Sequence, residues 1–180
     1  EHYFTRAYRL EISGYRYGVR GLIAPAATPG GQFHFANLDR TDAQGVELEL
    51  AANYAAGRQV RVSYARQRTE DATTGVELTS SPRQLAKLNA LWPLVSDRLV
   101  AGLELQFHGA VRTLGGATAK DFLLGNLTLT SRGLIDGLEL SASAYNLFDT
   151  HYGYPGAADH AQEVLPQPGR SLRLKATYRF

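Results

Sequence analysis

The chain of 180 residues contains no cysteine, so it forms no disulfide, no thiolate metal site and no cysteine nucleophile. It also has no run approaching the roughly 18 apolar residues that a membrane-spanning helix needs. If this chain crosses a membrane, it must cross as β-strands, because strands are the other structure that satisfies every backbone group in lipid.

Two further absences narrow the possible functions. The 19 basic and 17 acidic residues are scattered, whereas a nucleic-acid partner requires a concentrated basic face, so no such partner is predicted. Common catalytic motifs are missing as well: there is no Gly-rich phosphate loop, no H-E-x-x-H and no G-x-S-x-G. We therefore expect neither an enzyme nor a bound cofactor.

What the sequence does contain is a recurrent alternation of apolar and polar residues. At the C-terminus one face would carry Leu172, Leu174, Ala176, Tyr178 and Phe180, and the other Ser171, Arg173, Lys175, Thr177 and Arg179. Successive strand side chains point to opposite faces, so this segment predicts a strand with one apolar and one cationic face. The same pattern predicts strands in 46–54, 60–65, 99–107, 123–130 and 137–148, and the noisier stretches 8–21 and 83–92 also fit.

The connections between these eight strands alternate in length. Short links are expected near 55–58, 93–98 and 131–136, and longer links near 23–32, 69–82, 113–120 and 149–169. Short turns at one end and long loops at the other are typical of outer-membrane barrels, with the short turns on the periplasmic side. A soluble β-sandwich also alternates. Strands of roughly 11 to 16 residues exceed the usual ~5–6 and favour the membrane barrel.

Several segments resemble the TonB-dependent outer-membrane receptors. The step from Tyr145 through Asn-Leu-Phe to Asp149, then Tyr152, the Gly169-Arg170 pair and a last strand ending Tyr178-Arg179-Phe180 are similar to that family's barrel terminus. The stretches 37–49 and 81–89 fit as well. The resemblance implies an all-β chain, about 8 C-terminal strands of a 22-stranded antiparallel transmembrane barrel in the outer membrane of a Gram-negative bacterium.

The same resemblance implies what lies outside this chain. Residues 1–180 would be the C-terminal portion of the barrel, with the plug domain and the TonB-contacting segment absent. Partners would be outer-membrane lipid, the rest of the barrel and the plug, and TonB only through those absent segments. Tyr178 and Phe180 resemble the terminal signal that the barrel-assembly machinery reads.

The candidate ligand contacts lie in the longest predicted link. His151, Tyr152, Tyr154, Asp159 and His160 combine ring, phenol and carboxylate groups on what would be an external loop, where barrel function tends to sit. Two histidines nine residues apart match no recognised metal spacing, so a solvated loop is favoured over a metal site.

Polar residues on the inner face of the predicted barrel have a structural interpretation. Glu139 is expected to lie near Thr177 or Arg179 on the next strand, and a charge ladder that solvates the wall or docks a plug is favoured over a selective ring. Tyr54 and Trp92 are interpreted as members of the aromatic girdle at the periplasmic interface.

The predicted function is therefore a part of an active-transport receptor for a scarce ligand, such as a ferric siderophore, cobalamin or another small molecule or metal chelate. The chain would supply barrel wall and external loops. A self-contained 8-stranded outer-membrane barrel with a structural or adhesion role stays open as an alternative, since eight strands can close around their own side chains. A soluble all-β enzyme or binding protein is a second alternative.

Overall fold

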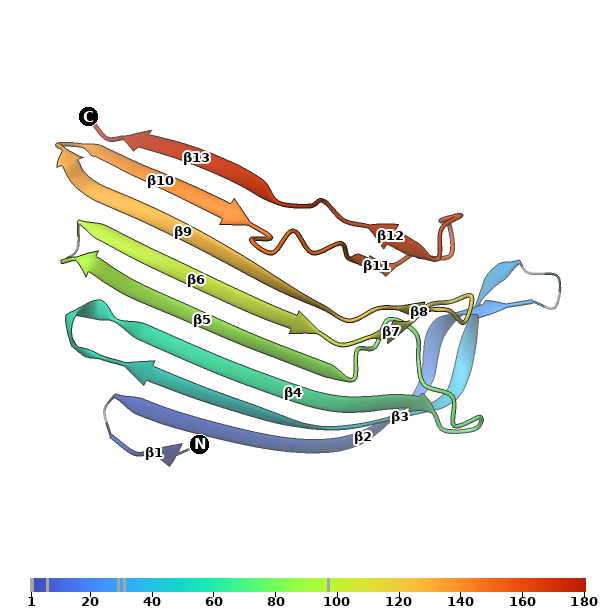
Figure 1. Cartoon of the computed structure of the whole chain (residues 1–180). Helices are drawn as coiled ribbons and strands as arrows, with labels where there is room; N and C mark the ends of the chain where they lie inside the picture. Colours follow the sequence, from blue (N-terminus) through green and yellow to red (C-terminus); the bar gives the residue numbers. More distant parts are fainter. Residues whose placement is uncertain (1, 6, 29, 31, 97) are drawn as a thin grey trace.

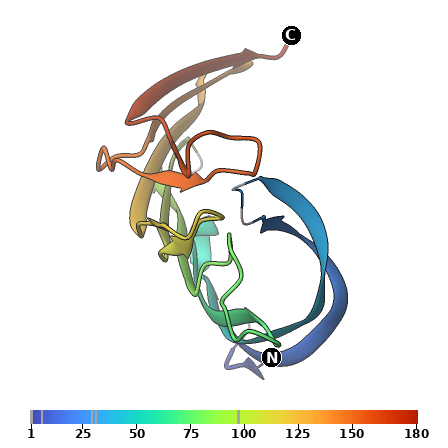
Figure 2. The same cartoon turned by 90° about the vertical axis from the view of Figure 1, so that its right-hand side faces the viewer.

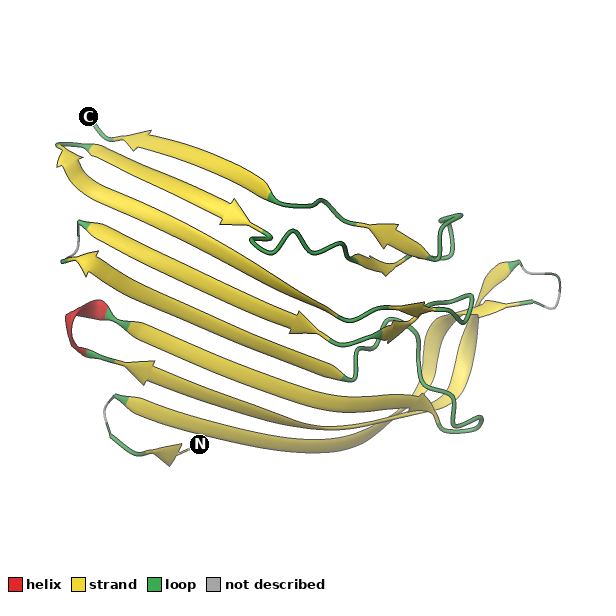
Figure 3. Cartoon of the chain, viewed as in Figure 1, coloured by secondary structure: helices red, strands yellow, loops and turns green. Residues whose placement is uncertain are grey.

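A computed structural model describes residues 2–5, 7–28, 30, 32–96 and 98–180. Over these residues the chain is built from antiparallel strands and one short 3-10 turn, η1 (Ala55–Gly57), as Figure 3 shows. No helix in the described part of the chain is long and apolar enough to span a membrane.

Nine strands form one sheet, and neighbours in the sheet are also neighbours along the chain apart from two small hairpins that branch off it (Figure 1). In sheet order they are β1 (His2–Tyr3), β2 (Tyr8–Ala27), β3 (Phe33–Asn53), β4 (Gln59–Asp71), β5 (Gln84–Val95), β6 (Leu99–His108), β9 (Phe122–Ile135), β10 (Leu138–Tyr145) and β13 (Ser171–Tyr178). The hairpins are β7 (Val111–Arg112) with β8 (Thr118–Ala119), and β11 (Gly153–Pro155) with β12 (Val164–Pro166). The eight long strands are those predicted from the alternation.

The strand lengths differ from the expected 11 to 16 residues in both directions. β2 and β3 have 20 and 21 residues, whereas β10 and β13 have 8 each. The predicted long link at 23–32 was wrong, because β2 and β3 stay paired out to Ala27 opposite Phe33. The two short turns before β6 and β10 are also tighter than predicted, since β5 extends to Val95 and β9 to Ile135.

The register sorts the side chains of the sheet onto two faces. One cross-strand row reads Leu10, Leu50, Val62, Leu88 and Leu105; we call the face that carries it the apolar face. The adjacent row reads Arg9, Ala51, Arg61, Asn89, Glu104 and Asn126 and lies on the polar face. Large apolar side chains on the apolar face are open to the surroundings, with Leu172 80 % and Leu174 84 % exposed. A wall whose apolar side is uncovered is suited to contact with lipid.

The sheet is open over the described residues. β1 and β13 stand at its two edges, and β1 covers only two residues of β2, opposite Arg9 and Leu10. Seen from the loop end, the sheet curves as a trough rather than closing into a ring (Figure 2). An 8-stranded barrel closed on itself is therefore not what the described residues form.

The two ends of the sheet differ as predicted. Short turns join the strands at the end where both termini lie, and the long connections gather at the opposite end, called here the loop end (Figure 1). At the short-turn end Tyr54 packs edge-on against Tyr8, with ring centroids 5.6 Å apart, and the Arg58 guanidinium lies 5.0 Å from the Trp92 ring. Tyr54 and Trp92 thus sit at this end of the wall, where an aromatic girdle is expected.

Candidate functional site

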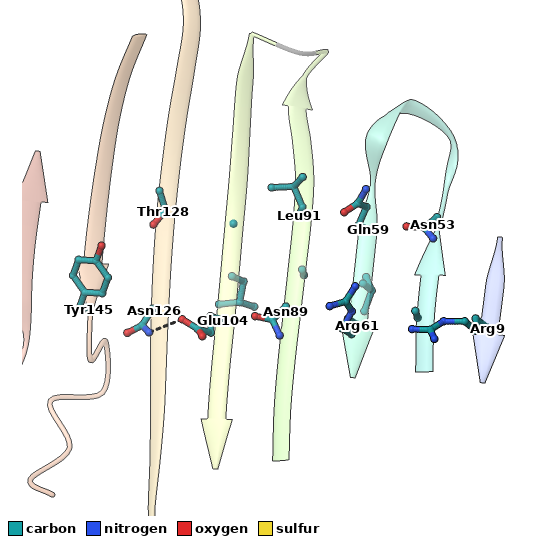
Figure 4. A pocket seen from close by; sticks show the side chains of 15 residues that line it. Arg9, Asn53, Gln59, Arg61, Asn89, Leu91, Glu104, Asn126, Thr128 and Tyr145 are labelled. Atoms are coloured by element: carbon teal, nitrogen blue, oxygen red, sulfur yellow. Dashed lines mark hydrogen bonds between the residues drawn. The ribbon is translucent and has the colours of Figure 1, made fainter. Parts of the chain in front are cut away.

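The centre of the polar face is a broad groove of about 720 Å³ that runs across β2 to β10. Figure 4 shows the side chains that line it, projecting from successive strands. Both carboxylate oxygens of Glu104 accept hydrogen bonds, one from Gln106 Nε2 on the same strand and the other, at 2.9 Å, from Asn126 Nδ2 on β9. The groove is therefore a preformed polar wall rather than an apolar pocket.

Charges on this wall pair with one another instead of forming a ring of one sign. Arg9 contacts the carboxylates of Glu11, at 2.7 Å, and Glu49, and Arg61 lies 3.8 Å from Glu49. Further across the sheet, Glu139 lies opposite Thr177, as predicted, while its carboxylate pairs with Arg132 at 3.0 Å. Arg179 is thus not the partner of Glu139 within the described residues.

The Asn-Leu-Phe-Asp segment makes a tight turn where β10 ends. Asn146 has φ 50° and Asp149 φ 52°, a left-handed conformation that Asn and Asp tolerate better than most residues. The Asn146 side chain donates to Thr150 O at 3.0 Å and accepts from Thr150 N at 2.9 Å, while Asn146 N donates to Asn126 Oδ1. Asp149 Oδ1 accepts from Arg170 N at 2.8 Å. Asn146 thereby fixes the turn that starts the long loop 149–169, and Asp149 ties this start to the end of the loop.

At the loop end of the polar face, four rings gather into an aromatic cluster formed by His108, Phe122, Tyr152 and Tyr154. His108 and Phe122 are directly opposite in the β6–β9 register and stack with centroids 5.1 Å apart. Tyr152 lies 4.6 Å from Phe122, and Tyr154 meets both Phe122 and His108 edge-on. Tyr152 and Tyr154 were predicted as candidates, whereas the two residues that seat them were not.

Partial burial within the aromatic cluster affects one of its phenols, that of Tyr154. Burial, and secondarily the neighbouring Tyr152, raises the pKa of Tyr154 above its ordinary value. Tyr154 therefore stays a neutral hydrogen-bond donor across the physiological range. The cluster offers aromatic faces and phenol hydroxyls on the polar face, on the loop-end side of the polar groove.

A carboxylate joins the two loop hairpins. Glu163 accepts a hydrogen bond from the hydroxyl of the fully buried Thr113 at 2.6 Å, and a longer one from Ala117 N at 3.3 Å. Between the hairpins lies a cavity of about 350 Å³ lined in part by Lys120, Asp121, His151 and Tyr152. The sequence marks Glu163 as a polar residue of the long loop, but it does not predict the contact with Thr113, because that residue lies 50 positions away.

The other predicted residues are not assembled into one site. His151 lies at the cavity between the hairpins, whereas Asp159 and His160 face each other at 4.0 Å on the exposed tip of the loop. Within the described residues no group of three His, Cys, Asp or Glu side chains is arranged to hold a metal ion. Tyr178 is 61 % exposed on the apolar face opposite Leu138, and Phe180 is fully exposed after the last strand.

An open antiparallel wall with one apolar and one polar face, short turns at one end and elaborated loops at the other defines a piece of a transmembrane β-barrel of an outer membrane. The family model described as TonB dependent receptor-like, beta-barrel, matches residues 1–155, and the chain belongs to this family. Members of this family are transport receptors of the outer membrane of Gram-negative bacteria, not enzymes. No curated sequence relative matches the chain.

Solved structures with the same fold include receptors for different cargo. The ferric-catecholate import receptor Fiu from E. coli K12 is 19 % identical with a TM-score of 0.74, and the match covers 98 % of this chain and 26 % of Fiu. The copper transporter OprC is 20 % identical with a TM-score of 0.79, covering 99 % of this chain and 30 % of OprC. The ferripyoverdine receptor of Pseudomonas aeruginosa is 16 % identical with a TM-score of 0.73, covering 98 % of this chain and 25 % of the receptor. The chain thus spans roughly a quarter to three tenths of the length of these proteins.

Proposed function

We propose that the chain is the C-terminal part of the barrel of an active-transport receptor, and that it supplies wall and external loops for the uptake of a scarce small molecule or metal chelate. A ferric siderophore is the favoured cargo class, with cobalamin or another metal complex as further members. The observation that carries the proposal is the aromatic cluster at the loop end of the polar face. Aromatic faces stack on flat organic ligands, and phenol hydroxyls donate hydrogen bonds to their oxygens.

In this proposal the chain performs no bond chemistry. The polar face lines the lumen, where its paired charges solvate the wall and dock a plug domain contributed by another part of the protein. Energy coupling through TonB would involve those other parts and not residues 1–180. The exposed aromatic side chains of Tyr178 and Phe180 would be read by the barrel-assembly machinery during insertion.

Ligand binding by variants of the complete protein tests the proposal. Tyr152→Ala and Tyr154→Ala each remove a ring from the aromatic cluster, and we expect about tenfold weaker binding of the cognate chelate, since a ring at a contact centre contributes roughly 1–2 kcal/mol. The probes are a ferric catecholate, a ferric hydroxamate, cobalamin and free Cu²⁺. Tyr64→Ala is the matched control, because Tyr64 lies on the apolar face. Unchanged binding of every probe in both cluster variants contradicts the proposed contact site.

The assembly proposal has a separate test. Phe180→Ala is expected to reduce the folded, heat-modifiable receptor recovered from outer membranes, whereas Leu172→Ala, at an exposed residue on β13, is expected to reduce it less. Equal recovery of the Phe180→Ala variant and the wild-type protein argues against a terminal signal at this position.

A further inference from the structure

The apolar face changes character sharply along β2, β3 and β4. Moving toward the loop end, two rows are wholly apolar, first Leu10, Leu50 and Val62, then Ile12, Leu48 and Tyr64. The following rows on the same face are Gly14, Val46 and Arg66, then Arg16, Gln44 and Arg68, then Gly18, Asp42 and Glu70, and finally Arg20 opposite Arg40. On β4 the change takes two residues, from Tyr64 to Arg66, whereas on β2 it takes four, from Ile12 to Arg16. On β3 the apolar run ends at Val46 and polar Gln44 follows.

Arginines outnumber carboxylates in these rows. All five are exposed, and we call them together the arginine patch: Arg16, Arg20, Arg40, Arg66 and Arg68. Two carboxylates stand among them, with Arg40 Nε 2.7 Å from Asp42 Oδ1 and Arg68 2.7 Å from Glu70. In the part of the chain that the structure describes, no carboxylate pairs with the other three. The patch therefore keeps a net positive charge.

Three arginines of the patch line a shallow hollow of about 550 Å³. Gly14 and Val46 contribute to its lining, together with the guanidinium-bearing side chains of Arg16, Arg66 and Arg68. A Cβ atom placed on Gly14 would meet no described atom within 4 Å, so space is open above this glycine. The hollow combines a small residue with three cations, one on β2 and two on β4, the two strands that flank β3.

The position of this hollow distinguishes it from an ordinary solvated surface. It lies on the face that contacts lipid and begins where the apolar rows end, at the level where hydrocarbon gives way to headgroups. It also lies toward the loop end, which faces the outside in this class of barrel. The polar groove and the aromatic cluster are on the opposite face of the sheet.

We propose that the arginine patch binds the phosphate of an anionic lipid headgroup in the outer leaflet, with the lipid chains lying along the apolar rows beneath. A guanidinium group can donate two parallel hydrogen bonds to the oxygens of one phosphate. This planar, forked geometry favours specific binding of phosphate over loose association with a monovalent anion. Continuity between the cationic hollow and the aliphatic rows selects a lipid over a soluble anion. The inference rests on the outer-membrane location and not on the cargo, so failure of either proposal leaves the other intact.

The test measures lipid binding to the complete receptor in a neutral detergent. The probe is bisphosphorylated lipid A, compared with its dephosphorylated form and with inorganic phosphate. The triple variant Arg16→Gln, Arg66→Gln, Arg68→Gln is expected to bind the phosphorylated lipid on the order of a hundredfold more weakly, since each arginine near a lipid surface contributes roughly a fivefold factor. Arg61→Gln, on β4 but on the polar face, is the matched control and should bind as the wild-type protein does.

Measurements on the wild-type protein keep the test decisive if the triple variant folds poorly. Affinity for the phosphorylated lipid should fall with added salt, and the dephosphorylated form should bind at least tenfold more weakly. Replacing the three arginines by lysine should retain part of the affinity, because charge is kept and the fork is lost. Equal binding of both lipid forms, equal loss in Arg61→Gln, or displacement by inorganic phosphate at matched concentration overturns the proposal.

Discussion

The two flanks of this sheet build their external parts in different ways. On the N-terminal flank, β2 and β3 continue as a paired ribbon for 19 register pairs, so the external part is an extension of the wall itself. On the C-terminal flank, β10 ends at Tyr145 and β13 begins at Ser171, and the intervening chain is organised by Asn146, Asp149 and Glu163. Backbone hydrogen bonds hold the first region, whereas the second depends on one short hairpin, β11–β12, and on the contacts of a few side chains.

This difference affects how each flank responds to substitution. Backbone hydrogen bonds between two paired strands involve many residues and no side chains, so the loss of one side chain changes the stability of the ribbon little. A loop that depends on single side chains to satisfy buried polar groups has no such redundancy. The C-terminal flank also carries the aromatic cluster, so the more fragile region is the one proposed to contact ligand.

The largest effect is expected at the turn after β10. Asn146→Ala removes two side-chain hydrogen bonds with Thr150 and places alanine at φ 50°, together about 2–3 kcal/mol against local order. Hydrogen exchange in the complete receptor should accelerate on the order of fiftyfold in 146–170. Asn146→Gly also removes both hydrogen bonds, but glycine adopts a positive φ without strain, so an exchange rate between those of the wild-type protein and Asn146→Ala is expected. Exchange confined to wild-type rates in both variants contradicts the proposed role of this turn.

The carboxylate between the loop hairpins is expected to have the next largest effect. Glu163→Ala leaves the buried Thr113 hydroxyl with only a longer bond to Ala117 O, a loss of about 1–2 kcal/mol. Limited proteolysis should then cut 109–121 and 156–164 several times faster. Glu77→Ala, which removes an ion pair to the exposed Arg83 in the connection between β4 and β5, is the comparison and should change proteolysis little. Equal sensitivity of the two variants contradicts the proposed role of Glu163 in the C-terminal flank.

A smaller effect is expected within the N-terminal ribbon. Tyr15 lies across Gly45, and its hydroxyl donates to Gln67 Oε1 at 3.0 Å. Gly45→Ala places a Cβ within 2.6 Å of the Tyr15 ring, so the ring must shift at a penalty of about 1 kcal/mol. Gly14→Ala, where space is open, should be neutral. Thermal loss of heat-modifiable mobility on gels compares the two variants, and a larger loss for Gly14→Ala contradicts the packing described.

The smallest effect concerns pH at the loop that follows β4. Hydrogen bonds from the Thr74 backbone, and then from the Thr74 hydroxyl and Thr73 backbone, hold the pKa of Asp71 below its ordinary value near 3.8. Because the pKa of Asp71 is lower in the folded loop than in the unfolded chain, the ionised carboxylate stabilises the loop at pH values above the unfolded-state pKa. This stabilisation is lost as the pH falls through the folded-state pKa. Amide exchange at Thr73 and Thr74, corrected for intrinsic rates, should therefore rise only at acidic pH. In Asp71→Asn this acid dependence should vanish.

Much of the wall was predictable from sequence because lipid on one side and water on the other impose a period of two. The eight long strands and their faces follow from that period, and β5 was recovered even though Lys87 and Asn89 interrupt its apolar run. Strand ends were less predictable. Beyond Gly21 both faces of β2 lie outside the membrane, so the alternation fades while the backbone pairing continues, and the sequence there suggests a loop.

The candidate site was predictable only in part. Tyr152 and Tyr154 could be proposed from their place in a long loop, but His108 and Phe122 join them through the β6–β9 register, which no local pattern specifies. The contact of Glu163 with Thr113 depends on how the two loop hairpins dock, and it likewise cannot be predicted from a local sequence pattern. The face on which a residue lies is predictable here, because it follows from the alternation along the strand. Contacts that depend on strand register or on the docking of two hairpins are not predictable.

The unbroken register between β2 and β3 has a genetic consequence. Loss or gain of one codon inside either strand would exchange the lipid-facing and lumen-facing side chains of everything beyond it, carrying charges such as Glu47 and Glu49 to the hydrocarbon. Changes of two codons would preserve the assignment of faces and shorten or lengthen the ribbon by one step. Insertions and deletions within the two strands should therefore involve even numbers of residues. In the segment that joins the strands, insertions and deletions of any length should be tolerated.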